Sequence, residues 1–137
     1  MSYLKGSLIT QIILAVCLLI SPLMGKQHIY EAPPALMNEV RSNLLLVDAN
    51  PTSANTVFEL AMSYAYTGQI EKGWATLKKV PNYDPDYAPK VIEKYSKLIE
   101  SDPTNWKYHF KLAFGYYFLK KKEMTISQFD NVLKIDP

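Results

Sequence analysis

The sequence predicts an all-α fold in which helix-turn-helix repeats follow an N-terminal apolar helix. The first observation is a template that occurs twice, with the same separation between its leucine and its final proline in both copies. The copies are Leu60-Ala61-x-x-Tyr64 to Pro85 and Leu112-Ala113-x-x-Tyr116 to Pro137. The second observation is apolar spacing at three and four positions, which is typical of helices. A recurring template indicates a repeat architecture, and such repeats build binding surfaces.

The third observation is the uncharged run 6–25. Because of this run, residues 1–25 are predicted to be a signal peptide or a transmembrane anchor. Lys5 precedes the run, and a short basic segment before an apolar one is typical of export. At about 1.5 Å per residue, the run can just span a hydrocarbon core of about 30 Å. Lys5 favours a cytoplasmic N-terminus. The rest would then face outward, or become periplasmic or extracellular if the signal is cleaved. The sequence leaves cleavage open.

Composition narrows the possible partners. The chain has 137 residues, 48% of them hydrophobic, and a formal net charge of +2, which fits one modest domain without a strongly basic surface. We therefore expect no nucleic-acid partner. The single cysteine, Cys17, lies in the uncharged run, so the rest of the chain has no disulfide and no cysteine-ligated metal site.

Residues 26–34 are predicted to be a linker, and residues 35–137 a helical repeat domain. Its first helix, at 35–48, has one apolar face and ends near Asn50-Pro51, because the residue before a proline leaves the helical region. That face contains Leu36, Val40, Leu44 and Val47.

The two template copies predict two helix pairs, at about 54–87 and 106–137. In the first pair, Gly68 permits the turn and Pro81 ends the second helix. The predicted helices are about 53–66 and 71–79 in the first pair, and about 104–119 and 123–135 in the second. One extra amphipathic helix, at about 87–101, lies between the pairs.

The spacing within both pairs resembles the tetratricopeptide repeat (TPR), whose pattern is W-x2-L-G-x2-Y, then A-x3-F, then P. The first unit contains Val57-x2-Leu60-Ala61-x2-Tyr64, Gly73-x3-Leu77 and Pro85. The second contains His109-x2-Leu112-Ala113-x2-Tyr116, Thr125-x3-Phe129 and Pro137. Val57 and His109 replace the usual tryptophan, and Lys120 replaces the turn glycine of the first unit. The resemblance implies a TPR-like α-solenoid that holds a protein or peptide ligand.

The two units lie farther apart in the chain, from Leu60 to Leu112, than adjacent repeats of about 34 residues would. The excess is about half a repeat, and we interpret it as one inserted helix at 87–101, which bends or offsets the stack. The helix at 35–48 would be an unpaired cap at the start. No polar capping helix follows Pro137, so we expect either a longer array or another molecule to cover that end.

In TPR proteins the first helix of each pair lines a concave groove, and transfer by spacing provides candidate ligand residues. They are Asn55, Glu59, Met62 and Tyr66 in the first unit, and Lys107, Phe110, Lys111, Phe114 and Tyr117 in the second. An aromatic groove flanked by Lys107 and Lys111 would suit an extended or helical peptide of acidic character. The alternative is that the extra helix, or neighbouring repeats, pack against this face.

The sequence predicts no enzyme. It contains no Gly-rich phosphate loop, no H-E-x-x-H and no cysteine nucleophile outside the apolar run. We expect an exported or membrane-tethered adaptor, possessing neither metal nor small-molecule cofactor, that acts in envelope assembly and contacts the membrane through residues 6–25 if uncleaved. The alternative is an N-terminal regulatory repeat region of a longer protein with a separate effector or catalytic domain.

Overall fold

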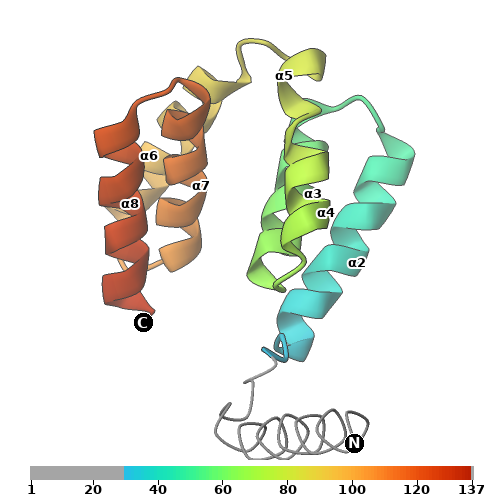
Figure 1. The fold of residues 1–137 in the computed structure, drawn as a ribbon, viewed down its shortest axis with the longest axis horizontal. Coiled ribbons are helices and arrows are strands. Elements are labelled where there is room, and N and C mark those ends of the chain that lie inside the picture. The colour runs from blue at the N-terminus through green and yellow to red at the C-terminus, as the bar shows by residue number, and fades with distance from the viewer. Residues whose placement is uncertain (1–29, 137) are drawn as a thin grey trace, which may run out of the picture. The chain divides into compact units, whose positions relative to one another are not determined.

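The computed structural model describes residues 30–136, and every secondary-structure element in this range is a helix (Figure 1). The helices are α2 (Pro34–Ala49), α3 (Ala54–Tyr66), α4 (Ile70–Leu77), α5 (Val80–Tyr83), α6 (Tyr87–Ser101), α7 (Trp106–Phe118) and α8 (Lys122–Ile135). The all-α prediction is therefore confirmed for this part of the chain. They belong to one unit, residues 32–137.

The predicted signal or anchor, 1–25, and the first part of the predicted linker, 26–29, lie outside the described residues. Within residues 30–136, no helix is long and apolar enough to cross a membrane.

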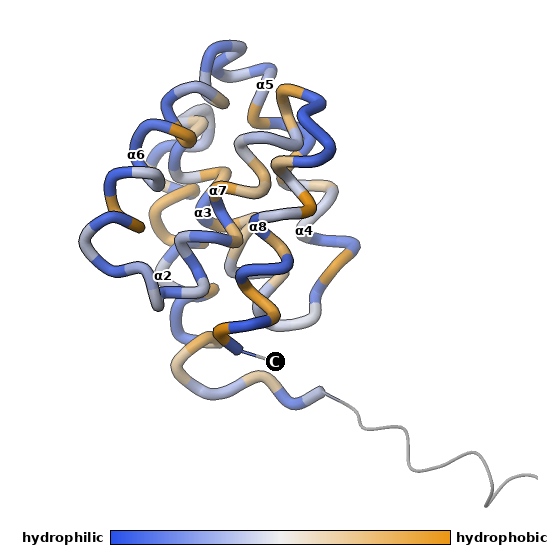
Figure 2. The backbone as a smooth tube through the Cα atoms, turned by 90° about the vertical axis from the view of Figure 1, so that its left-hand side faces the viewer, coloured by the Kyte–Doolittle hydropathy of each residue, from blue (hydrophilic) through white to orange (hydrophobic). Residues whose placement is uncertain are grey.

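Local sequence signals set several helix ends. The Ser53 hydroxyl accepts a hydrogen bond from the Thr56 amide at 3.4 Å, which satisfies one free N–H group at the start of α3. Asn50 ends α2 immediately before Pro51, as predicted. Hydrophobic and hydrophilic residues alternate along the helices (Figure 2), so each helix can bury one face.

The helix predicted at 71–79 corresponds to α4, and a short helix that was not predicted, α5, follows it. α4 ends at Leu77, and Pro81 lies in the first turn of α5. Proline cannot donate a backbone hydrogen bond to the carbonyl four residues earlier, but its fixed φ suits the first turn of a helix. Pro81 therefore ends one helix and helps to begin the next.

Asn43, and not Leu44, completes the buried face of α2. Leu44 was expected on that face, but it is 38% exposed, whereas Asn43 is 9% exposed. The Asn43 amide donates to the Glu59 carbonyl at 3.2 Å, so its burial leaves a satisfied polar group. The expectation for Leu44 was wrong because α2 turns its 40–43–47 stripe toward α3.

Helices that follow one another in the chain pack together, α2 on α3, α3 on α4, α6 on α7, and α7 on α8. Small residues allow these close approaches. Ala61 and Ala113 are 1% and 0% exposed. A Cβ atom added at Gly115 would lie 2.9 Å from Ile92 Cγ1, so α6 and α7 fit closely only because residue 115 has no side chain.

Two sets of three helices recur with one constant offset along the chain, the same offset that separates Leu60 from Leu112. α3 and α7 begin and end at this offset, α2 and α6 end at it, and α4 and α8 begin at it. We call α2–α3–α4 the N-terminal triplet and α6–α7–α8 the C-terminal triplet. The helix predicted as an insert, α6, packs on α7 as α2 packs on α3. It therefore occupies the position of a first helix in the second triplet.

The α3–α4 and α7–α8 turns have the same backbone geometry. Gly68 has a φ of 73° and Lys120 a φ of 57°, both in the left-handed region. The Gly68 amide donates to the Ala65 carbonyl at 3.1 Å, and the Lys120 amide to the Tyr117 carbonyl at 2.9 Å. Lys120 thus adopts a conformation that costs an L-residue about 1 kcal/mol and that glycine tolerates.

The two triplets meet through side chains of α3 and α7, which run in opposite directions (Figure 1). The end of α3 faces the start of α7, with the Tyr66 and Phe110 ring centroids 5.2 Å apart. The start of α3 faces the end of α7, with 6.5 Å between the Phe58 and Phe118 centroids. These are equivalent contacts made twice, as in an approximate two-fold arrangement. The inserted helix, α6, was expected to bend or offset the stack of repeats. Instead, the second hairpin, α7–α8, runs in the opposite direction to the first, α3–α4.

Candidate functional site

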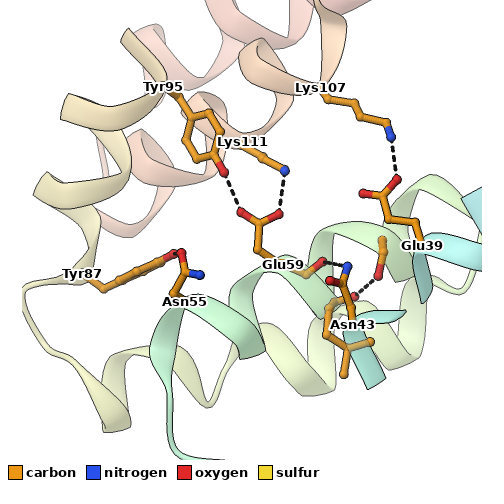
Figure 3. A network of polar contacts seen from close by, with 10 residues as sticks. Glu39, Asn43, Asn55, Glu59, Tyr87, Tyr95, Lys107 and Lys111 are labelled. Carbon is orange, nitrogen blue, oxygen red and sulfur yellow. Dashed lines mark hydrogen bonds and ion pairs between the residues drawn. The ribbon is translucent and has the colours of Figure 1, made fainter. Parts of the chain in front are cut away.

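A buried ion pair joins the middle of α3 to the middle of α7 (Figure 3). Lys111 Nζ donates to Glu59 Oε2 at 2.6 Å, and the Tyr95 hydroxyl donates to Glu59 Oε1 at 2.5 Å. The side chains of Glu59 and Lys111 are only 19% and 10% exposed. Both carboxylate oxygens are therefore satisfied, as a buried charge requires, and Glu59 ties α3 to α6 as well as to α7.

Two tyrosines of α6 act as hydrogen-bond donors to α3. Burial raises the pKa of Tyr95 far above its usual value, and the negative charge of Glu59 raises it further. Burial, followed by the charge of Glu59, also raises the pKa of Tyr87, whose hydroxyl donates to Asn55 Oδ1 at 3.1 Å. Because both pKa values lie above the ordinary value, both hydroxyls stay protonated near neutral pH and keep these bonds.

The polar residues predicted to face a ligand have partners within the same unit. Asn55 and Glu59 bind tyrosines of α6, and Lys111 binds Glu59. Lys107 Nζ lies 2.5 Å from Glu39 Oε2 of α2. The predicted positive flank, Lys107 and Lys111, is thus matched by carboxylates. For these polar residues the packing matches the alternative interpretation, in which the extra helix contacts this face.

Two of the predicted aromatic and apolar residues lie deep between the triplets. Met62 is 1% exposed and Tyr66 is 6% exposed. The Tyr66 ring packs edge to face against Trp106, with a centroid distance of 4.9 Å. These two residues therefore contribute first to the contact between α3 and α7.

An apolar pocket remains where α4 and α8 flank the contact between α3 and α7. Its volume is about 210 Å³. The lining includes Met62 of α3, Ile70 and Trp74 of α4, Phe110 and Phe114 of α7, and Phe129 of α8. Three predicted site residues, Met62, Phe110 and Phe114, are thus brought together, although the walls come from helices that the prediction did not include.

The pocket continues along α7 toward the α7–α8 turn. Trp74 and Leu77 also line a neighbouring pocket that contains Tyr117 and Phe118. Tyr117 and Phe118 in turn line a third pocket, of about 530 Å³. The third pocket adds Lys120, Lys122, Thr125 and Ile126. Neighbouring pockets thus share lining residues, and we call the surface lined by these three pockets the aromatic groove.

The aromatic groove exposes large apolar side chains from three helices. Ile70, Trp74, Tyr117 and Ile126 are 53%, 40%, 48% and 48% exposed. Trp74 packs edge to face on Phe114 and Tyr117, with centroid distances of 6.0 and 5.6 Å. A contiguous exposed apolar surface of this kind is typical of an interaction site.

Sequence reasoning placed only Tyr117 among these exposed residues. Ile70, Trp74 and Ile126 belong to the second helix of each hairpin, which the TPR resemblance assigns to packing. One signal could have found Trp74, since it is one of only two tryptophans and lies on a short helix that has little room to bury it.

His109, expected to replace a packing tryptophan, has two polar partners in addition to its burial. Its Nδ1 atom lies 2.8 Å from Gln128 Oε1 and its Nε2 atom 3.0 Å from the Pro103 carbonyl oxygen. It therefore links α7 to α8 and to the loop before α7. Among residues 30–136, no group of three or more His, Cys, Asp or Glu side chains is placed to hold a metal ion.

Comparisons with protein-family models and with curated proteins find no match for this sequence. The class that the fold and the groove define is an all-helical protein with an apolar groove between two helical triplets, and the TPR relationship stays a prediction.

Proposed function

We propose that this protein is a TPR-like adaptor without catalytic activity, and that it binds a partner protein by holding an apolar segment in the aromatic groove. The observation that carries the proposal is the exposure of Ile70, Trp74, Tyr117 and Ile126 in this groove. A partner that covers these side chains would gain a binding free energy of about 25 cal/mol for each Å² of apolar surface removed from water.

The form of the groove favours a peptide segment as ligand. It is lined by side chains of α3 and α7 together with those of α4 and α8, the second helices of the two hairpins. Aromatic residues in such positions commonly dominate binding energy, because they are rigid and offer pockets for aliphatic or aromatic anchors. An extended segment and an amphipathic helix can both present anchors at suitable spacing.

We further propose that the adaptor acts outside the cytoplasm, in envelope assembly. The support is the uncharged run 6–25 preceded by Lys5, which would export the chain or tether it to the membrane. A tethered groove would raise the effective concentration of a partner that is itself at the membrane.

The binding function can be tested by selecting peptides from a random phage-displayed library. The bait is the full chain in phosphatidylcholine nanodiscs. We expect enriched peptides whose affinity falls about 10-fold or more in Trp74→Ala and Tyr117→Ala. Circular dichroism melting checks that both variants remain folded, and Trp74→Phe, which retains an aromatic ring, should lose less affinity.

The matched control is Tyr83→Ala, because Tyr83 is an aromatic residue of similar exposure, 39%, that does not line the groove. Binding that is equal in all variants, or no enrichment of any peptide, would contradict the proposal.

A further inference from the structure

The two ends of the aromatic groove have turns of similar backbone geometry, but they differ in the charge of their side chains. From this difference we infer that its ligand is an apolar segment with an acidic cluster at one end, and that it is bound in a single direction. The inference rests on the proposed binding function and adds the chemistry and the orientation of the ligand.

The end of the groove at the α7–α8 turn is positively charged. Lys120 and Lys122 line it beside Tyr117, and Lys78, which directly follows α4, lines the adjacent pocket beside Trp74. All three lysines are exposed. The four ion pairs found among the described residues use Lys90, Lys97, Lys107 and Lys111, so these three lysines have no carboxylate partner there.

The opposite end carries no comparable charge. The equivalent turn between α3 and α4 consists of Gly68, Gln69 and Ile70, and Ile70 lines the groove there. The two turns lie at opposite ends because α3 and α7 are antiparallel (Figure 1). Glu71 and Lys72, which follow this turn, carry opposite charges. At the other turn, residues 120–122 are all lysines, and Glu123 is the one acidic residue that follows them directly.

In this arrangement, different residues determine the affinity for the ligand and the direction in which the ligand binds. Apolar anchors over Trp74 and Phe114 provide binding energy in either orientation, because burial of apolar surface is not directional. Carboxylates can meet Lys78, Lys120 and Lys122 in only one orientation, so charge complementarity selects that orientation and speeds association. Lys107 and Lys111 do not contribute, since Glu39 and Glu59 already neutralise them.

The peptides selected in the binding experiment test this inference directly. We expect Asp and Glu to be enriched on one side of the apolar anchors. The double variant Lys120→Glu/Lys122→Glu should bind these peptides about 10-fold more weakly. Peptides in which the acidic residues are changed to Lys should regain affinity for this variant. Glu at position 122 is compatible with folding, because an acidic residue suits the first turn of a helix.

Lys94→Glu is the control, because it reverses the charge of one exposed lysine of α6 that lines none of the three pockets of the groove. It should alter affinity less than twofold, because salt screens charges that lie far from the ligand. If the selected peptides have no acidic bias, or the double variant binds them unchanged while Trp74→Ala does not bind them, this inference is overturned and the binding function stands. If Trp74→Ala has no effect, both are overturned.

Two other occupants of the groove would give distinct results. Binding to phosphatidylserine vesicles that the double variant abolishes, with no peptide enriched, would assign the groove to a lipid surface. A concentration-dependent dimer that Trp74→Ala abolishes would assign it to a second copy of the chain. Either result would overturn the inference.

Discussion

In the N-terminal triplet the segment after the turn is divided into α4 and α5, whereas in the C-terminal triplet α8 runs unbroken over Lys122–Ile135. The equivalent positions are Pro81 and Leu133, and a proline at this position disfavours a continuous helix. The break lets Val80 reach the core at 1% exposure, while its equivalent, Val132, is only partly buried. No residue of α8, which lies wholly in the described range, is fully buried.

This difference shows how one arrangement of helices can bury a core and also leave apolar side chains exposed. The turns and the first helices of the two hairpins are alike, so they determine the frame. The second helices differ, and they decide how much apolar surface stays in the aromatic groove. Differences at a few positions of α4 and α8 therefore decide which apolar side chains stay exposed.

A second comparison concerns the two residues at the centre of the frame. Glu59 and Lys111 occupy equivalent positions in α3 and α7 and contact each other. Two identical acids or bases at this point would place like charges together in a buried site, which is strongly unfavourable. Opposite charges at equivalent positions therefore allow the antiparallel contact.

The largest expected effect comes from breaking this central pair. Glu59→Ala leaves Lys111 buried without its carboxylate and removes the acceptor of Tyr95, so we expect a loss of about 3–5 kcal/mol in the free energy of unfolding. Urea unfolding followed by circular dichroism measures it. The double variant Glu59→Met/Lys111→Met should recover much of the loss, because it buries no unpaired charge.

Glu93→Ala is the matched control, since its ion pair with Lys97 has side chains that are 70% and 71% exposed. This variant should leave stability nearly unchanged, because an ion pair exposed to water contributes little. Similar losses for Glu59→Ala and Glu93→Ala would show that the central contact does not hold the triplets together.

We expect an intermediate effect from variants that test how closely the first two helices of each triplet pack together. Gly115→Ala places a Cβ atom against Ile92 and Val91, and overpacking of this kind costs about 1–3 kcal/mol. The equivalent residue in α3, Ser63, already has a side chain, which is fully buried. Ser63→Ala removes one hydrogen bond to the Leu60 carbonyl and should cost about 1 kcal/mol or less. Thermal unfolding midpoints of the two variants should differ in that order, and a reversed order would contradict the close α6–α7 contact.

The smallest effect concerns the two turns. Lys120→Gly should stabilise the protein by about 1 kcal/mol, because glycine adopts the left-handed conformation without strain. Gly68→Lys should destabilise it by a similar amount, and chemical denaturation measures both. Lys121 has an ordinary φ of −87°, so Lys121→Gly should bring no gain. Equal effects of Lys120→Gly and Lys121→Gly would mean that the turns are not equivalent.

Local features explain which parts of the fold could be predicted. Gly68, Pro81 and Asn50 before Pro51 act on the backbone within a few positions, so these helix ends could be predicted from the chain itself. The template residues Leu60, Ala61, Leu112 and Ala113 are buried, as their repeated spacing indicated. The break at Pro81 was placed correctly, but the short helix that follows it was not foreseen.

Long-range contacts explain what the prediction of the site missed. Candidate residues were taken from the first helix of each hairpin as if the two hairpins ran in the same direction. The antiparallel arrangement turns Glu59 toward Lys111 and Tyr95, and it places Trp74 of α4 against Phe114 and Tyr117 of α7. The groove walls therefore come from the second helices.

By itself the sequence determined an all-helical chain, the positions of its turns and the two matching hairpins, because helix propensity, proline and glycine act locally. Only the tertiary structure decided that the hairpins run in opposite directions and that Lys107 and Lys111 are neutralised. It also decided that Lys78, Lys120 and Lys122 line the groove without a carboxylate partner among residues 30–136. The physical reason is that these outcomes depend on which side chains meet across long stretches of chain, as Lys107 meets Glu39 and Lys111 meets Glu59. Such pairings follow from the direction in which helices pack, which no local pattern specifies.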